Sequence, residues 1–114
     1  ISSVAADGSL PYMPTIGYCT SKGAVRSFTK ALASEWAKYD IKVNEIAPVF
    51  FETEMTREFV NSDSTKGTMD RLSPMKRAGK EGELDSTLLY LLAESSRFIT
   101  GTTHVVDGGW SCGR

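Results

Sequence analysis

The stretch that decides the fold is GYCTSKGAVRSFTKALASEWAKY, residues 17–39. Its bulky apolar residues recur at three- and four-residue spacing, which predicts one long helix. They are Val25, Phe28, Leu32 and Trp36. A second stripe on the opposite side consists of small residues and would let another helix approach closely. Its members are Ala24, Ser27, Ala31 and Ser34. The sequence therefore predicts a helix that is packed on both sides.

Apolar segments on both sides of this helix indicate an α/β protein. Residues 1–5, ISSVA, and residues 41–47 predict strands, and Pro48 ends the second of them. Residues 81–95 predict another helix, and residues 102–106, TTHVV, predict a final strand. This alternation, strand–helix–strand–helix–strand, favours parallel strands that are joined by helices.

The remaining segments read as loops and short helices. Residues 6–16 contain glycine and proline and predict a loop. Residues 53–60 predict a short helix with Thr53 as its N-cap. Residues 61–80 are polar and indicate a mobile loop or short helical pieces, and the sequence DGG at 107–109 predicts a turn.

Composition excludes several classes of protein. The chain has 114 residues, which allows one domain at most. Its 13 Lys and Arg nearly balance 14 Asp and Glu, which argues against binding to nucleic acid or to an acidic membrane. No apolar run approaches the roughly 20 residues that span a bilayer. The single His104 and two cysteines argue against a zinc site, which needs about four such ligands. The cysteines are expected to be free thiols in a reduced cytoplasm, and the alternative is a disulfide between them.

Tyr18 and Lys22 are the most informative residues, because they stand four apart at the predicted start of a helix. That spacing places both side chains on one face, with Cβ atoms about 6 Å apart. A neighbouring ammonium and a helix N-terminus both favour a phenolate, so they lower the pKa of a tyrosine. A phenol tuned in this way can exchange a proton with a substrate oxygen. The alternative is an ordinary surface lysine beside a half-buried tyrosine.

Four segments in this order carry a resemblance to a known family. They are ISS at 1–3, YCTSKGAV at 18–25, IKVNEIAP at 41–48 and ITGTTHVVDGG at 99–109. Together they resemble the short-chain dehydrogenase/reductase family over essentially the whole chain. The resemblance implies that Ser3, Tyr18 and Lys22 are catalytic. Ser3 is chosen over Ser2 because it directly precedes a small apolar stretch.

The roles implied by this resemblance are specific. The tyrosine is the general acid/base, the lysine binds the nicotinamide ribose, and the serine orients the substrate carbonyl or hydroxyl. A hydride passes between the substrate and NAD or NADP. The sequence does not indicate which of the two nicotinamide cofactors is used.

The segment after the second predicted strand reads PVFFET, residues 48–53, where the family often has Pro-Gly and then Thr. The resemblance implies a set of cofactor-binding residues. They are Tyr18, Lys22, Pro48, Val49, Phe51 and Thr53. Val49 replaces the glycine, and a β-branched residue at positive φ would be strained. Either φ is negative at Val49 or the loop takes another path. Phe50 and Phe51 are equally well explained by core packing.

A dinucleotide-binding fold normally has a glycine-rich turn after its first strand, and this sequence contains none. We therefore expect residues 1–114 to form the C-terminal catalytic portion of one Rossmann-like domain with a doubly wound parallel sheet. The glycine-rich cofactor half would be absent, and the 114-residue fragment alone would be inactive.

The substrate is less clearly indicated. ALASEWAKYDIKVNEIAP and VVDGGW resemble most the members that act on sugar acids and polyols. Five cations in 61–80 would suit an anionic substrate, or they belong to a solvated loop; they are Lys66, Arg71, Lys76, Arg77 and Lys80. Residues 10–14 are expected to border the substrate pocket. The alternatives are a 3-oxoacyl-thioester (acyl-carrier-protein) reductase and a truncated, non-catalytic assembly fragment. We expect a homo-oligomer, either a dimer or a homotetramer, built through the small-residue stripe and the strand at 102–106.

Overall fold

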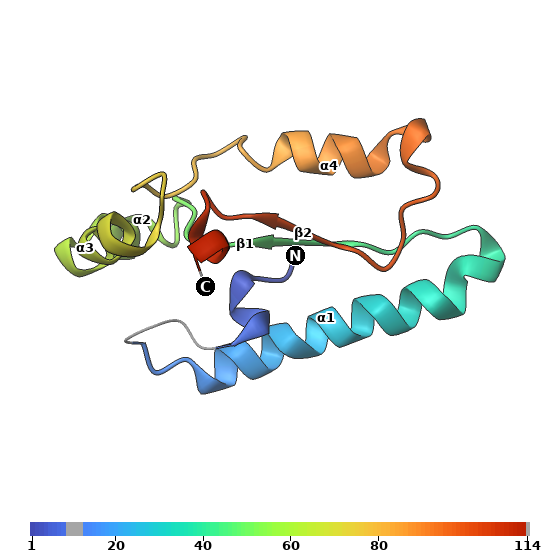
Figure 1. Cartoon of the computed structure of the whole chain (residues 1–114), viewed down its shortest axis with the longest axis horizontal. Helices are drawn as coiled ribbons and strands as arrows, with labels where there is room; N and C mark the ends of the chain where they lie inside the picture. Colours follow the sequence, from blue (N-terminus) through green and yellow to red (C-terminus); the bar gives the residue numbers. More distant parts are fainter. Residues whose placement is uncertain (9–12, 114) are drawn as a thin grey trace.

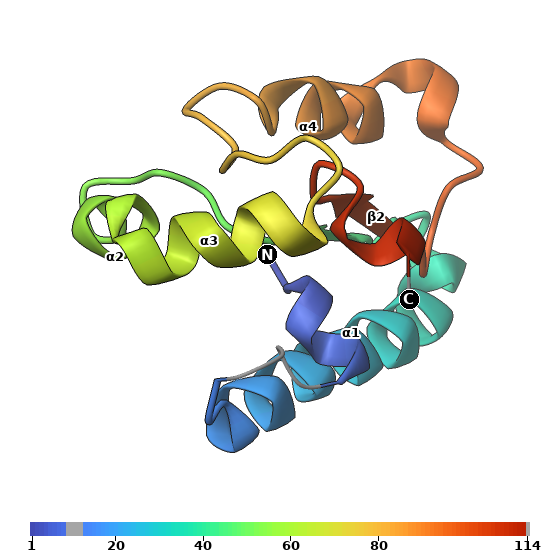
Figure 2. The ribbon, with the colours of Figure 1, turned by 60° about the vertical axis from the view of Figure 1, so that its left-hand side comes forward.

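A computed structural model describes residues 1–8 and 13–113 of the chain (Figure 1). Its centre is a parallel pair of strands, β1 (Glu45–Pro48) and β2 (Thr103–Val106), with Glu45 opposite Thr103. Helices α1 (Ile16–Trp36) and α4 (Asp85–Leu92) lie on opposite sides of this pair in both views (Figure 1, Figure 2). The predicted α/β class with parallel strands is confirmed.

Helix α1 was predicted correctly, and it continues as a 3-10 turn over Ala37–Tyr39. Asp40 ends it in a left-handed conformation with φ of 60°, which aspartate adopts more readily than most residues. The buried face of α1 is formed by Thr29 and Ala33. The two predicted stripes flank that face, and 63% of Phe28 is exposed. Within the described residues of a single chain, the helix is therefore packed on one side, and the small-residue stripe is open.

The predicted strand at 1–5 is wrong. The amide of Ser2 donates to the carbonyl of Ile46 (2.9 Å), as a neighbouring strand would. After Ser3, however, the chain turns into a 3-10 helix over Val4–Asp7. The cause is local: the Ser3 hydroxyl accepts from the amide of Ala5 and caps the turn.

The strand predicted at 41–47 is shorter and later than expected. Its first residues pair with 99–102 through side chains, because Asn44 Oδ1 accepts from the amide and the hydroxyl of Thr102. A backbone ladder begins only at Glu45. In the segment leading into β1, these side-chain hydrogen bonds therefore supplement a backbone hydrogen bond from the amide of Gly101 to the carbonyl of Val43 at 2.8 Å.

The polar segment after β1 contains more helix than its sequence indicates. Helix α2 spans Arg57–Asn61, so it begins after the predicted Thr53 cap. Helix α3 spans Asp63–Leu72 and is capped by Ser62, whose hydroxyl accepts from the amide of Thr65. This helix buries only Thr65 and Met69, so it has no apolar period for a sequence reading to detect.

The core lies where the N-terminal segment meets the C-terminus. Val4 and Ala5 are buried with Trp110, and the partly buried Phe50 packs against them. The Phe50 and Trp110 rings meet edge to face, with centroids 5.4 Å apart. Among the described residues, no helix combines the length and the apolar character needed to cross a membrane.

Candidate active site

Two of the three predicted catalytic residues share one cavity. Ser3 and Tyr18 both line a space of about 270 Å³. Ser3 precedes the 3-10 turn, and Tyr18 lies in the first turn of α1. Most of the remaining wall is apolar. It is formed by Val4, Met13, Val49, Phe50, Phe51, Phe59 and Val60. Of the segment 10–14, Met13 is part of this wall, whereas residues 10–12 lie outside the described residues.

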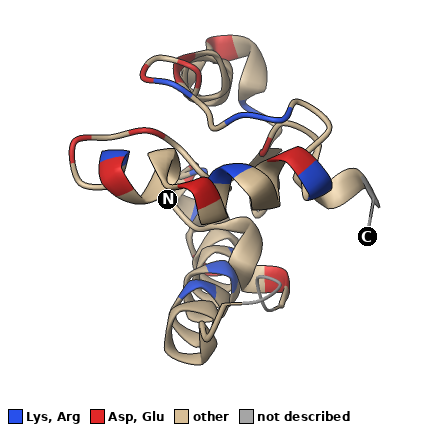
Figure 3. Cartoon of the chain, turned by 90° about the vertical axis from the view of Figure 1, so that its left-hand side faces the viewer, with Lys and Arg blue, Asp and Glu red and all other residues tan. Residues whose placement is uncertain are grey.

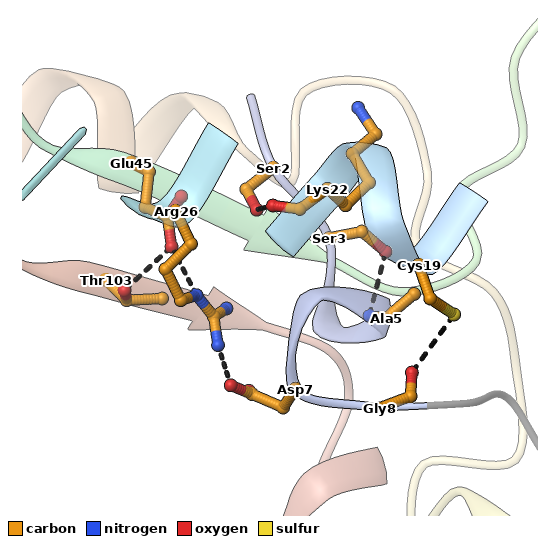
Figure 4. A network of polar contacts seen from close by, with 10 residues as sticks. All are labelled: Ser2, Ser3, Ala5, Asp7, Gly8, Cys19, Lys22, Arg26, Glu45 and Thr103. Carbon is orange, nitrogen blue, oxygen red and sulfur yellow. Dashed lines mark hydrogen bonds and ion pairs between the residues drawn. The ribbon is translucent and has the colours of Figure 1, made fainter. Parts of the chain in front are cut away.

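The Ser3 hydroxyl is oriented by its own backbone. Its Oγ accepts from the amide of Ala5 at 3.2 Å, so the hydroxyl hydrogen can be donated to a ligand (Figure 4). Ser2 is directed elsewhere, because its hydroxyl donates to the carbonyl of Lys22 at 3.4 Å. Ser2 does not line the cavity. The geometry therefore favours Ser3 over Ser2 as the serine that meets a substrate.

Tyr18 lies at the cavity with 47% of its surface exposed, so its phenol is accessible from solvent. Lys22 follows one turn later, with Nζ 5.7 Å from the centre of the Tyr18 ring. The ammonium donates to the carbonyl of Ile1 at 3.3 Å and is directed away from Ser3 in Figure 4. It is not part of the cavity wall. The structure thus brings Lys22 close to Tyr18 but not into contact with the space between Tyr18 and Ser3.

The predicted cofactor segment borders more than one hollow, and Phe51 lines both the cavity with Ser3 and the hollow that contains Thr53. Val49 and Phe51 line the cavity with Ser3, directly after Pro48 ends β1. Thr53 instead lines a separate, open hollow of about 470 Å³. Its hydroxyl is 2.8 Å from that of Thr56. Phe50 and Phe51 both contribute to the cavity wall. Phe50 also packs against the core, as the alternative interpretation expected.

Val49 is accommodated without backbone strain. Among the described residues other than glycine, only Asp40 and Lys76 have positive φ. The loop therefore follows the first of the two alternatives, with negative φ at Val49.

Sequence reasoning missed Thr56, which also lines the cavity, whereas Phe59 was expected either to line a pocket or to fill a gap, and it lines this cavity. The Thr56 hydroxyl donates to the carbonyl of Phe51 at 2.6 Å and accepts from the amide of Thr53 at 2.9 Å. It therefore fixes the loop that carries Phe51. The available signal was the pattern T-x-x-T at 53–56 ahead of a helix. In this pattern the second threonine forms the hydrogen bonds that hold the loop.

Gly79 supports the same wall from outside. Its amide donates to the carbonyl of Phe50, and its carbonyl accepts from the amide of Glu52, each at 2.9 Å. A Cβ atom at this position would lie 2.4 Å from the Phe51 ring. Only glycine lets the chain approach Phe51 so closely.

The five cations in 61–80, for which an anionic substrate was one of two interpretations, do not line the cavity with Ser3 and Tyr18. Lys66, Lys76, Arg77 and Lys80 line a hollow of about 290 Å³ that includes neither Ser3 nor Tyr18. Acidic residues share this hollow, and basic and acidic segments alternate along the ribbon (Figure 3). The described wall of the cavity around Ser3 and Tyr18 contains no charged side chain. No group of three or more His, Cys, Asp or Glu within 1–8 and 13–113 could hold a metal ion.

Arg26 and Glu45 form a largely buried ion pair outside the cavity that Ser3 and Tyr18 line. Arg26 Nε donates to Glu45 Oε1 at 2.7 Å, and Arg26 also forms an ion pair with Asp7 (Figure 4). The hydroxyl of Thr103 donates to the same Glu45 oxygen at 2.8 Å. Burial opposes ionisation of Glu45, but the hydrogen bonds from Thr103 and Arg26 and the charge of Arg26 outweigh it and lower its pKa. Glu45 is therefore a carboxylate at neutral pH.

Comparison with known proteins covers nearly the whole chain. Residues 1–111 match the family model described as Enoyl-(Acyl carrier protein) reductase. The chain is 42% identical over 96 residues to an uncharacterized oxidoreductase of Schizosaccharomyces pombe, a match that covers 83% of the chain and 34% of that protein. It is 33% identical over 108 residues to gluconate 5-dehydrogenase of Gluconobacter oxydans, covering 95% of the chain and 40% of that enzyme.

A solved structure gives the same result. The crystal structure of a gluconate 5-dehydrogenase from Burkholderia cenocepacia, in complex with NADP and tartrate, is 34% identical, with a TM-score of 0.88. The match covers 97% of this chain and 43% of that one. The chain thus spans about a third to two fifths of the length of the two curated relatives.

Proposed function

Because the chain belongs to the short-chain dehydrogenase/reductase family, we propose that the protein is an oxidoreductase that interconverts a carbonyl compound and a secondary alcohol. The observation that carries this proposal is the presence of Ser3 and Tyr18 in one cavity, with Lys22 beside the Tyr18 ring. A relative whose structure holds NADP supports a nicotinamide cofactor, either NAD or NADP.

The residues present fit the nicotinamide end of such a cofactor. Val49 and Phe51 offer an apolar wall next to Tyr18. The Lys22 ammonium has three N–H donors, and one of them donates to the carbonyl of Ile1. The others remain for the hydroxyls of a ribose. We propose that the nicotinamide end of the cofactor contacts Tyr18, Lys22, Pro48, Val49, Phe51 and Thr53.

In the proposed reaction the bound cofactor supplies or accepts the hydride. During reduction, the Tyr18 phenol gives its proton to the substrate oxygen, and during oxidation the phenolate takes it back. Ser3 donates its hydroxyl hydrogen to the same oxygen and fixes the orientation of the substrate. Lys22 stabilises the phenolate through its charge, because an ammonium nearby favours an anion.

We propose a sugar acid or polyol as the substrate class, supported by the similarity to two gluconate 5-dehydrogenases. A 3-oxoacyl thioester is the second candidate. It is favoured by one observation, the apolar wall formed by residues such as Met13, Phe50 and Phe59, which suits an acyl chain better than a row of hydroxyls.

We further propose a homo-oligomer, a dimer or a homotetramer, in the cytoplasm. All four residues of the small-residue stripe, Ala24, Ser27, Ala31 and Ser34, are exposed, which leaves that face of α1 open to a second copy. Cys19 and Cys112 are both free thiols, which is compatible with a reducing compartment.

The proposal is tested by Tyr18→Phe in the intact protein, assayed with gluconate and with a 3-oxoacyl thioester in the presence of each cofactor. We expect kcat to fall by about 100-fold or more, the usual contribution of a general acid/base, while NAD(P)H binding measured by fluorescence is retained. Tyr90→Phe is the matched control, because Tyr90 is similarly exposed (49%) but lies on α4. Unchanged turnover in Tyr18→Phe would contradict the proposal. An intact protein that turns over neither substrate class would favour the non-catalytic alternative.

A further inference from the structure

Three other segments of the chain meet at Glu45, a charged residue in the first position of β1. Only 2% of its side chain is exposed. Arg26 reaches it from α1, and Thr103 reaches it from β2. The N-terminal segment reaches the same junction through Asp7, which forms an ion pair with Arg26. A carboxylate in this place is thus linked to every element that carries a candidate catalytic residue.

Contacts fix the segment that holds Ser3 on both of its sides. Before Ser3, the amide of Ser2 donates to the carbonyl of Ile46 at 2.9 Å. After Ser3, Asp7 forms an ion pair with Arg26. The backbone turn between these two anchors places the Ser3 hydroxyl in the cavity wall. The segment that carries Ser3 is therefore held at Ile46 before it and at Arg26 after it.

Arg26 is likewise coupled to the other catalytic candidates. It stands four residues after Lys22 on α1, on the same face of the helix. Its side chain is 13% exposed, and its guanidinium contacts both Glu45 and Asp7. Figure 4 shows this guanidinium between β1 and the turn that follows Ser3. Arg26 therefore adds a side-chain link between the Ser3 segment and α1 to the hydrogen bonds that Lys22 forms with Ser2 and Ile1.

We propose that Arg26 and Glu45 are positioning residues, which hold the Ser3 segment against α1 so that Ser3 and Tyr18 reach the same substrate oxygen. Neither residue lines the cavity, so neither touches the substrate. This inference rests on the proposed function. Positioning matters because a displacement of about 1 Å at a reacting group can lower a rate about 100-fold.

Removing both charges together separates positioning from stability. A buried ion pair is often replaced by apolar residues of similar size without loss of stability. The variant Arg26→Met/Glu45→Leu is therefore expected to keep its thermal midpoint while losing the link to Asp7. We expect kcat to fall about tenfold or more, with the KM for NAD(P)H within about twofold of the original, because the cofactor contacts are unchanged. The control is Arg97→Met/Glu94→Leu, which removes an exposed ion pair of the same length, 2.7 Å.

A second variant, Glu45→Gln, tests the same role if Arg26→Met/Glu45→Leu does not fold. Glu45→Gln keeps the size and one acceptor oxygen of the side chain, and we expect it to lower kcat by about threefold at an unchanged KM for NAD(P)H. Amide exchange of Ser2 is expected to accelerate in both variants, since that amide belongs to the anchored segment. Full kcat in whichever variant folds would overturn the positioning role.

The outcome with Tyr18→Phe distinguishes the two proposals. If Tyr18→Phe is inactive while the Arg26/Glu45 variants keep full kcat, the positioning role alone is wrong. If Tyr18→Phe retains full turnover, the proposed function fails and the positioning role fails with it. A loss in both series, at unchanged stability and with the Arg97/Glu94 control fully active, supports both.

Discussion

Two arginine–glutamate pairs, Arg26–Glu45 and Arg77–Glu83, differ in burial and in geometry. The second pair has the better geometry, because two nitrogens of Arg77 donate to two oxygens of Glu83, each at 2.7 Å. Its side chains are about 40% exposed. Arg26 meets Glu45 through one hydrogen bond, and both side chains are nearly buried.

The difference shows that the geometry of an ion pair does not determine its importance. Arg77–Glu83 closes one short loop, and water screens its charges. Arg26–Glu45 lies where water screens little, and it joins segments that are far apart in the sequence. Losing one partner of the exposed pair leaves a solvated ion, whereas losing one partner of the buried pair leaves an ion without adequate solvation.

The largest effect is expected from Glu45→Ala. This change leaves the Arg26 guanidinium poorly solvated, with the exposed Asp7 as its remaining carboxylate partner. Breaking a buried pair in this way costs about 3–5 kcal/mol of unfolding free energy, measured by urea denaturation. The matched change Glu83→Ala is expected to shift the urea midpoint far less. Equal shifts in the two variants would remove the distinction between the pairs.

The sequence alone predicts the parts of this fold that rest on periodicity. The spacing of Val25, Phe28 and Leu32 located α1, and TTHVV located β2. It could not predict α3, whose buried residues include a threonine, or the turn after Ser3, where one side chain redirects the backbone. Local hydrogen bonds from Ser and Thr compete with regular structure and leave no periodic signal.

For the candidate site, a sequence reading finds residues near one another in the chain but not long-range partners. Tyr18 and Lys22 were identified from a spacing of four, and Ser3 from a family resemblance. Arg26 and Glu45 lie 19 residues apart and pair only when β1 packs on α1. The available signal was Glu45 itself, a charged residue directly before the apolar residues of a predicted strand, because such a residue needs a partner when it is buried.

An intermediate effect is expected from Gly79→Ala, in the loop that Arg77–Glu83 closes. The new Cβ would overlap the Phe51 ring, so either the ring or the loop must move. Overpacking of this kind costs about 1–3 kcal/mol, measured as a lower thermal midpoint. Gly67→Ala is the control, because Gly67 lies inside α3 with no atom within 4 Å of the new Cβ. It is expected to stabilise the protein by about 0.5–1 kcal/mol. A tolerated Gly79→Ala would show that the loop adjusts freely and that the exposed pair does not hold it tightly.

The smallest effect is expected from Glu83→Gln, and it depends on pH. The hydrogen bonds from Arg77 and from the amide of Lys80 lower the pKa of Glu83 from 4.5 to about 2. Because the folded pKa is the lower one, ionised Glu83 stabilises the folded state above the unfolded pKa, and this contribution is lost as the pH falls toward 2. The difference in urea midpoint between the original protein and Glu83→Gln should therefore be constant above about pH 5 and shrink toward pH 2. A difference that does not change over this interval would mean that the exposed pair, despite its two short hydrogen bonds, does not contribute to stability through its charge.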